Sequence, residues 1–290
     1  MLVTPFRQNQ SRPSIGIMQG RLTPSRGRGI QFFPFGEWEM EFEKAAKIGL
    51  NEIDFIFDHP NYRQNPLWSQ TGISKIKDLI SETGVVVRSI CADVFMSLLP
   101  HDWPWTENAN LPRFFLSSLV LSAYSAGAKI VEIPLLADSS LSAAHRRTNF
   151  ISFLSPCLPV AEYFGITFAI ETDLPPKDLL SLVLVFGGEV KLVYDTGNNA
   201  SLGYDPVEEI EISGEYIVNV HIKDRTLNGG TVPLGTGVVD FDAVFGTLAS
   251  KNYKGSFILQ AARGEDDKEV ETVAKQLDFL NRYLKKYKFI

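Results

Sequence analysis

Residues 166–195 read ITFAIETDLPPKDLLSLVLVFGGEVKLVYD, and this stretch decides the fold. Two short apolar runs, each ending in a carboxylate, flank the apolar segment KDLLSLVLVF, which has the length of a short helix. The proline pair at 175 and 176 separates the first run from that segment. The pattern predicts two strands joined by a helix, a unit whose strands run parallel.

The same unit recurs along the whole chain. Eight apolar runs end in or near a polar residue, at intervals of 24 to 39 residues, and these residues are Gln19, Asp54, Asp93, Glu132, Glu171, Asp195, His221 and Gln260. One strand and one helix fill each interval, so the sequence predicts an α/β fold, a single (β/α)8 TIM barrel. The alternative is an open doubly wound sheet, but no G-x-G-x-x-G turn follows the first run. In a barrel, all strand ends converge on one mouth, where we expect the chemistry.

Composition limits the function classes. The chain has 290 residues, of which 44% are apolar and 21% charged, and its net charge is −6. These values are typical of a globular enzyme and give no basic footprint for nucleic acid or an anionic membrane. No apolar stretch approaches the roughly 18 residues of a membrane span. Two cysteines, Cys91 and Cys157, cannot build a disulfide framework, which favours a cytoplasmic protein.

The domain organisation is simple. No shift in composition divides the chain, so we expect one barrel domain over residues 15–290. Residues 1–14 are polar and lack an apolar signal core, and we expect a flexible N-terminal arm there. Acidic barrels of this size commonly associate, which makes a homo-oligomer a candidate assembly.

Four consecutive predicted strands, the fifth to the eighth, end in Glu171, Asp195, His221 and Gln260. Neighbouring strands lie about 4.8 Å apart, so the four groups surround a volume about the size of one hydrated cation. Carboxylate oxygen, imidazole nitrogen and amide oxygen suit one divalent metal ion: Mn, Mg, Co or Zn. The alternatives are that Asp195 caps a helix and that His221 is a satisfied core histidine. A buried Glu171 without a cation or hydrogen-bond donors would be costly.

With these motifs the chain resembles the xylose isomerase-like TIM barrels, in particular the sugar phosphate isomerases and epimerases that include the ketose 3-epimerases. The resemblance covers almost the whole chain and rests on IET at Glu171, YDTGN at Asp195, VHIKD at His221 and PLGTGVVDF at 233–241. It implies that one divalent metal ion is held by Glu171, Asp195, His221 and Gln260. It also implies a small-molecule carbohydrate substrate, a sugar or sugar phosphate. The implied reaction is proton transfer next to a carbonyl through an enediolate, with the metal polarising the carbonyl.

The chain departs from the family pattern at the eighth strand. The ketose 3-epimerases use two glutamates as acid and base on opposite faces of the substrate, and Gln260 stands in the place of the second. A glutamine oxygen can bind a metal or a hydroxyl, but it cannot take a proton near neutral pH. Glu171 is therefore the candidate base of a one-base isomerisation. Glu132 is either a replacement acid or a salt-bridged barrel residue, and Asp54 has the same ambiguity.

The candidate substrate-binding residues are polar groups at strand ends and in the following loops: Gln19, Arg21, Asp54, Asp93, Asn198, Arg225 and Arg263. Arginine suits phosphate or carboxylate. Asn198 stands where ketose epimerases often have a histidine that reaches the substrate. Lys223 is a candidate catalytic residue that steadies a developing oxyanion. The glycine-rich loop 228–237 is either a phosphate-binding turn or an ordinary flexible turn.

Two other readings stay open. One is another metal-dependent lyase or hydrolase on the same barrel. The nucleases of this barrel group carry more histidines and usually three zincs, and the four histidines here, with one at a strand end, argue against a nuclease. The other is a catalytically impaired sugar-binding protein, which Gln260 supports. Aromatic residues in two of the loops either wall the pocket or pack the loops onto the barrel: Phe32, Phe33, Trp103 and Trp105.

Overall fold

The computed structural model describes residues 13–59, 61–99 and 110–290. Most of the expected N-terminal arm, residues 1–14, and both Trp103 and Trp105 lie outside the described residues. Within them, Ser14 already contacts the barrel, because its hydroxyl donates to Asn51 Oδ1 at 2.7 Å.

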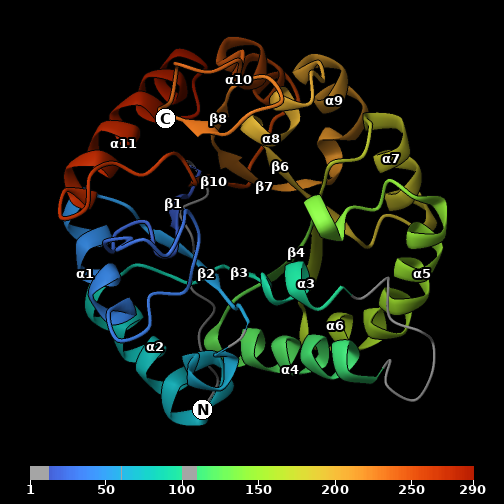
Figure 1. Cartoon of the computed structure of the whole chain (residues 1–290), viewed down its shortest axis with the longest axis horizontal. Helices are drawn as coiled ribbons and strands as arrows, with labels where there is room; N and C mark the ends of the chain where they lie inside the picture. The colour runs from blue at the N-terminus through green and yellow to red at the C-terminus, as the bar shows by residue number, and fades with distance from the viewer. Residues whose placement is uncertain (1–12, 60, 100–109) are drawn as a thin grey trace.

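Eight parallel strands close into a barrel, as the recurring apolar runs predict (Figure 1). Around the barrel the order is β1-β10-β7-β6-β5-β4-β3-β2. The strand bounds are β1 Ile15–Met18, β2 Glu52–Ile56, β3 Ser89–Cys91, β4 Ile130–Leu135, β5 Thr167–Thr172, β6 Lys191–Asp195, β7 Ile217–Ile222 and β10 Ser256–Leu259. The fold class is confirmed: the described residues form a single (β/α)8 barrel.

Helices surround the barrel and cover the outer side of the strands (Figure 1). The longer ones are α1 Trp38–Ile48, α2 Gln70–Thr83, α4 Asn110–Ala126, α5 Ala144–Leu154, α6 Leu158–Phe164, α7 Pro176–Val185, α9 Pro206–Ser213, α10 Phe241–Ser250 and α11 Glu269–Lys286. Short helical turns are α3 Val94–Ser97, α8 Thr196–Ser201, η1 Tyr62–Gln64, η2 Pro66–Trp68, η4 Ala137–Ser139, η5 Ser155–Cys157 and η6 Gly214–Tyr216. None of the described helices combines the length and apolar character that a membrane crossing requires.

Local sequence explains where several helices begin and end. Ser69 caps α2 by accepting from Gly72 N–H, and Asp240 caps α10 by accepting from Ala243 N–H. Gly49 ends α1 in the left-handed conformation that a glycine adopts at little cost. Pro156 lies in the 3-10 turn that separates α5 from α6, where its missing N–H interrupts the hydrogen bonding of a helix.

Two segments that follow strand ends have secondary structure of their own. The segment after Asp195 forms α8, and the Asp195 carboxylate caps it, as the helix-cap alternative predicts. The glycine-rich segment after β7 carries an antiparallel pair, β8 Asp224–Arg225 and β9 Thr231–Val232. The fully buried Asp224 carboxylate shapes this segment by accepting the backbone N–H groups of Arg225, Gly235, Gly237 and Val239. Asp224 therefore holds the segment in a defined conformation.

The loop over residues 19–37, between β1 and α1, is held to the barrel at several points. Buried Glu41 accepts the N–H groups of Gly20 and Leu22 and the hydroxyl of Thr23. Asp266, in the loop after β10, accepts the N–H groups of Ser25 and Arg26. We call residues 19–37 the β1–α1 loop. These bonds fix the loop as part of the barrel mouth.

Candidate active site

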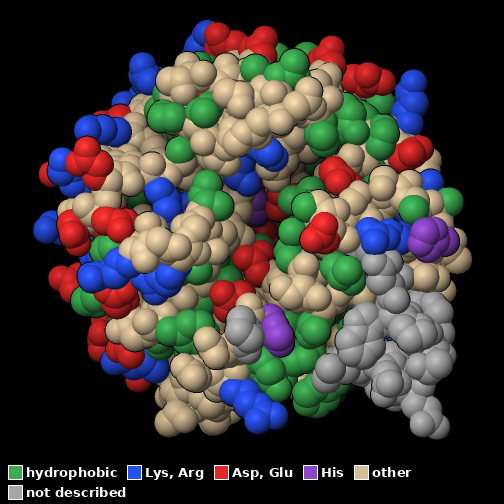
Figure 2. Space-filling model, viewed as in Figure 1, with side chains coloured by type: hydrophobic (Ala, Val, Ile, Leu, Met, Phe, Trp, Pro, Cys, Tyr) green, Lys and Arg blue, Asp and Glu red, His purple; other side chains and the backbone are tan. Residues whose placement is uncertain are grey.

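The strand ends open onto a central hollow of the molecule, which acidic and basic side chains border (Figure 2). His221 pairs in register with Asp195 on β6 and with Ile258 on β10, so these side chains point to the same side of the sheet. Gln260 follows Ile258 by two residues and keeps that side, one step nearer the mouth. The structure therefore brings together the ends of β6, β7 and β10 as the period-two pattern predicts.

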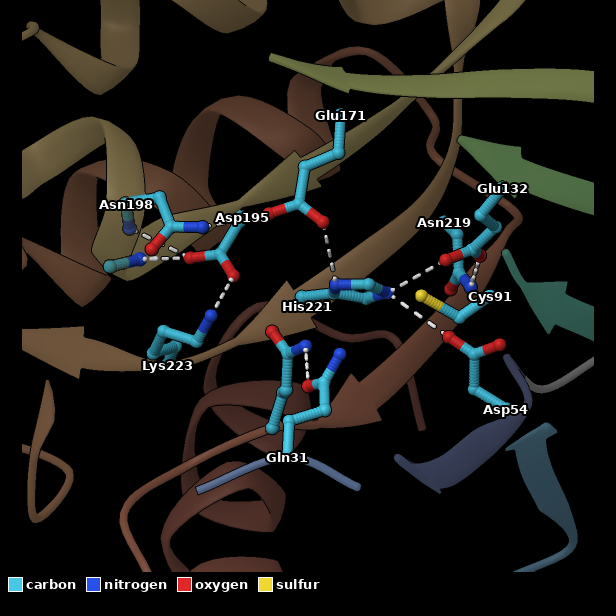
Figure 3. Close-up of polar contacts among 12 residues, drawn as sticks. Gln31, Asp54, Cys91, Glu132, Glu171, Asp195, Asn198, Asn219, His221 and Lys223 are labelled. Atoms are coloured by element: carbon cyan, nitrogen blue, oxygen red, sulfur yellow. Dashed lines mark hydrogen bonds and ion pairs between the residues drawn. The ribbon is translucent and has the colours of Figure 1, made fainter. Parts of the chain in front are cut away.

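Glu171, Asp195 and His221 form what we call the outer cluster. One ligand atom of each lies within 4.8 Å of the other two, and His221 Nδ1 is 3.6 Å from Glu171 Oε2 (Figure 3). Asp195 uses its two oxygens differently. Its Oδ1 accepts the N–H groups of Gly197 and Asn198 at the start of α8, and its Oδ2 lies 2.7 Å from Lys223 Nζ. Asp195 is thus a helix cap that still presents one oxygen to the site.

The outer cluster fits a divalent cation. His221 Nδ1 and Gln260 Oε1 are buried, and neither has a hydrogen-bond partner among the described residues. An orphaned buried acceptor is costly unless an ion or a ligand satisfies it. Two carboxylates, an imidazole nitrogen and an amide oxygen are donors that Mn, Mg, Co or Zn accept. The donor set expected from the sequence is therefore chemically suited to a metal.

Asp54 and Glu132 form an inner cluster on the other side of the imidazole (Figure 3). Asp54 Oδ2 and Glu132 Oε2 each lie 3.2 Å from His221 Nε2. Ser89 Oγ donates to Asp54 Oδ1 at 2.8 Å, and Asn219 Nδ2 donates to Glu132 Oε1 at 2.5 Å. Both carboxylates are almost without exposure, at 0% and 1%. Asp54 and Glu132 both lie behind His221, where they can orient its ring, and this arrangement favours the salt-bridged alternative that the sequence left open for them.

The inner cluster could also hold a cation, since Asp54, Glu132 and His221 Nε2 lie close enough together. We favour the outer cluster, because the two inner carboxylates already lie at hydrogen-bond distance from Nε2 and are closed off from solvent. A carboxylate that receives the far N–H of a ligating histidine fixes the tautomer and leaves the other nitrogen free to bind. Here that free nitrogen is Nδ1.

Charge and burial set the protonation of the cluster. Burial disfavours the imidazolium of His221, but Glu132, Asp54 and Glu171 outweigh burial and raise the pKa of His221 well above its usual value. Burial would raise the pKa of Glu171, yet the hydrogen bonding and charge of His221, followed by Lys223, lower that pKa below its usual value. Glu171 is therefore ionised at neutral pH. A cation at Nδ1 must displace a proton from His221, so binding should release protons.

Asn198 and Arg225 hold the Glu171 carboxylate in place. Asn198 Nδ2 donates to Glu171 Oε1 at 2.7 Å, and Arg225 Nη1 donates to Asn198 Oδ1 at 2.9 Å. The rest of the Arg225 guanidinium donates to the carbonyl of Gly229. Both residues were expected to contact substrate, and the structure shows them joined in a chain that ends on Glu171.

Four other expected substrate contacts, Gln19, Arg21, Asp93 and Arg263, take part in holding the mouth together. Gln19 Oε1 accepts Ile56 N–H, and Gln19 is 1% exposed. Arg21 donates to the carbonyl of Ile30; burial, followed by the charge of Arg263, lowers the pKa of Arg21 to about 9. Asp93 accepts from the side chain of Gln31.

Arg263 donates to three backbone carbonyls of the β1–α1 loop, those of Gly20, Thr23 and Ile30. Arg21 and Arg263, which were expected to bind a substrate anion, both hold the loop through these hydrogen bonds. Phe32 is stacked between Arg28 and Arg263, with guanidinium carbons 4.1 and 4.5 Å from the ring centre, and so serves packing. Phe33 packs against Phe35, 4.8 Å between ring centres.

Sequence reasoning missed Gln31, Asn219 and Ser89. Asn219 precedes His221 by two residues, so the period-two rule places it on the same face and could have found it. Ser89 begins β3, and its hydroxyl donates to Asp54. This pairing joins two separate strands, and no pattern in the sequence predicts it. Gln31 lies in the β1–α1 loop, where no periodicity predicts direction. Its amide contacts both Asp93 and Gln260.

Comparison with known proteins agrees with the fold and the motifs. A family model described as a xylose isomerase-like TIM barrel matches residues 42–283. The L-ribulose-5-phosphate 3-epimerase UlaE of Escherichia coli (strain SMS-3-5 / SECEC) is 26% identical over 269 residues, which cover 87% of this chain and 92% of that relative.

Solved structures agree in fold. An L-ribulose 3-epimerase superposes with a TM-score of 0.72 at 16% identity, over 95% of this chain and 96% of the other. A xylose isomerase-like TIM barrel protein from Mycobacterium smegmatis in complex with magnesium gives a TM-score of 0.68 at 17% identity, over 97% and 99% of the two chains.

Proposed function

The chain belongs to the family of xylose isomerase-like TIM barrels, and on this premise we propose that it is a metal-dependent isomerase or epimerase of a sugar or sugar phosphate. Its similarity to sugar epimerases in sequence and in fold supports this class of enzyme. The observation that carries the proposal is the outer cluster, in which ligand atoms of Glu171, Asp195 and His221 lie within 4.8 Å of one another. Gln260, which follows the neighbouring strand β10, adds an oxygen that is buried without a hydrogen-bond partner among the described residues.

Four side chains would hold the cation: Glu171, Asp195, His221 through Nδ1, and Gln260 through Oε1. When bound, a divalent ion of the Mn, Mg, Co or Zn type supplies Lewis acidity that polarises a substrate carbonyl. The solved magnesium complex of a fold neighbour supports this kind of cofactor. Asp54 and Glu132 act from behind, where they orient His221.

Glu171 is the group that we propose moves the proton. Its carboxylate is ionised at neutral pH, and Asn198 fixes the direction of Oε1. It can accept a proton from the carbon next to the carbonyl and return it, on the same face, to the former carbonyl carbon, which a one-base isomerisation requires. The proton of the neighbouring hydroxyl moves to the former carbonyl oxygen, so the step balances. Lys223 Nζ lies 2.7 Å from Asp195 Oδ2, and we propose that its positive charge stabilises the substrate oxygen that becomes negative in the enediolate.

The test is exchange of substrate carbon-bound hydrogen with solvent. The protein is incubated in D₂O with Mn²⁺ and a panel of ketoses and ketose phosphates, and deuterium incorporation is followed by NMR and mass spectrometry. We expect exchange with one or more of these sugars and none for Glu171→Gln, whose fold is checked by circular dichroism. Full exchange by Glu171→Gln would remove Glu171 from the mechanism. No exchange with any sugar by the wild-type protein would reject the enzyme class.

One observation favours a second function, a catalytically impaired sugar-binding protein. Gln260 replaces a group that the ketose 3-epimerases use for proton transfer, and an amide cannot perform that step near neutral pH. This alternative predicts saturable sugar binding without exchange in the same panel. A calorimetric titration on the same samples separates the two functions.

We also infer a cytoplasmic location, because Cys91 and Cys157 are both free in the described structure. The proposal extends to one barrel domain over residues 15–290 after an N-terminal arm, and to a homo-oligomer as the assembly in solution. Light scattering measures that assembly directly.

A further inference from the structure

Gln31 joins the ends of two strands across the mouth of the barrel. Its Nε2 donates to Asp93 Oδ2 at 2.7 Å, and its Oε1 accepts from Gln260 Nε2 at 2.7 Å. Asp93 follows β3 and Gln260 follows β10, so one side chain from the β1–α1 loop connects them. The three side chains form a hydrogen-bonded chain, Asp93–Gln31–Gln260.

The two hydrogen bonds of Asp93–Gln31–Gln260 run in one donor-to-acceptor direction, and Asp93 determines that direction. An ionised carboxylate only accepts hydrogen bonds, so it must receive the amide N–H of Gln31. Burial raises the pKa of Asp93 to about 6, which still leaves it ionised at neutral pH. The oxygen of Gln31 must then face Gln260 and can only receive an N–H from it. Gln260 uses its Nε2 for this bond, so its Oε1 points away from Gln31. This oxygen is buried without a hydrogen-bond partner in the described part of the chain.

The backbone on both sides of Gln31 is fixed by hydrogen bonds and packing, and this holds the Gln31 side chain in position between Asp93 and Gln260. The carbonyl of Ile30 accepts from both Arg21 and Arg263. Two residues after Gln31, Phe33 N–H donates to Asp58 Oδ2 at 3.1 Å, and the Phe33 ring is 2% exposed. An amide held in this way pays little ordering entropy for the bonds it makes.

We propose that Asp93 and Gln31 are positioning residues that turn the Gln260 amide so that its oxygen, and not its nitrogen, faces the outer cluster. The inference rests on the proposed function, since the oxygen is turned toward the cation that function requires. It explains how a glutamine serves at a position where a carboxylate would need no such control: a carboxylate presents an oxygen whichever way it turns. The donor set then carries two negative charges, from Glu171 and Asp195.

The experiment measures Mn²⁺ affinity of the full chain by calorimetry and by electron paramagnetic resonance. Gln31→Leu removes both hydrogen bonds at similar size, and we expect it to weaken Mn²⁺ binding about tenfold, the low end for an outer-shell change. In the Gln260→Glu background the same Gln31→Leu change should alter affinity less than about twofold, because both carboxylate oxygens are ligands. In the Gln260→Leu background, which offers no oxygen, it should have no further effect.

Gln276→Leu is the matched control. It deletes a buried glutamine that donates to the carbonyl of Ala262 near the same loop, outside the chain of amides, and should leave Mn²⁺ affinity unchanged. Thermal unfolding of every variant verifies the fold.

Two outcomes would overturn the inference alone: unchanged affinity in Gln31→Leu, or an equal loss in all three backgrounds, which would indicate a general disturbance of the loop. Wild-type protein that binds no Mn²⁺ would overturn the inference and the metal dependence of the proposed function together. Sugar exchange by the wild-type protein, measured separately, shows whether the isomerase or epimerase class still holds when the inference fails.

Discussion

Replacing Glu209 by glutamine should remove part of the pH dependence of stability. Glu209, on α9, is 4% exposed, and its two oxygens accept from Asn199 Nδ2 at 2.6 Å and from Tyr194 Oη at 3.2 Å. Burial raises the pKa of this carboxyl group from 4.5 to about 7. The folded protein therefore holds a proton on Glu209 that the unfolded chain releases near pH 4.5.

The sign follows from this proton difference. Between pH 4.5 and about 7 the folded state binds more protons, so the free energy of unfolding falls as pH rises through this window and levels off above it. The difference between 4.5 and about 7 corresponds to about 3.5 kcal/mol of stability, because one pKa unit is worth about 1.4 kcal/mol. Glutamine mimics the protonated acid and lacks this titration.

The assay is urea unfolding of wild type and Glu209→Gln at pH 5 and at pH 8. The wild-type free energy of unfolding should fall relative to the variant by about 2.5 kcal/mol over this range, because part of the effect already appears below pH 5. Comparing the two proteins cancels the titration of other groups, Asp54 and Asp93 included. A difference that changes by less than about 1 kcal/mol, or a wild type that gains on the variant as pH rises, would refute the reasoning.

Three further changes follow from the geometry. Asp224→Ala leaves four backbone N–H groups without their acceptor and should destabilise the fold by about 3 to 5 kcal/mol, measured by urea unfolding; loss under 1 kcal/mol would show that water replaces the carboxylate. Gly197→Ala places a Cβ 2.8 Å from Lys223 Cγ and should lower the free energy of unfolding by about 1 to 3 kcal/mol, with a lower kcat, because Lys223, which follows β7, must move. An unaffected melting temperature would contradict this prediction. Asn198→Leu frees the Glu171 carboxylate and should lower kcat about 10- to 100-fold with a small change in stability; a change confined to KM would instead mark Asn198 as a substrate contact.

The fold could be read from the sequence because strand and helix spacing repeats. Each apolar run is short and followed by a helix-length segment, and only a parallel sheet accommodates that order. The depth of individual side chains could not be read in the same way. Asp54 and Glu132 share the inward face with His221, but period two gives the face of a strand and not the height within the barrel, which the stagger of neighbouring strands sets.

The loops were the least predictable part of the site. Arg21 and Arg263 are residue types that commonly bind anions, yet both donate their N–H groups to carbonyls of the β1–α1 loop. Gln31 carries no signal in the sequence, because its importance depends on where the anchored loop places one amide. Asp195 shows the opposite case: its helix-capping and ligand readings were taken as alternatives, and one oxygen is available for each.

Crystals grown with Mn²⁺ and measured at the manganese absorption edge test the central claim most directly. We predict one anomalous peak, from a bound Mn²⁺, within bonding distance of Glu171, Asp195, His221 Nδ1 and Gln260 Oε1. A peak between Asp54 and Glu132 on the Nε2 side of His221, or no peak at saturating Mn²⁺, would contradict it.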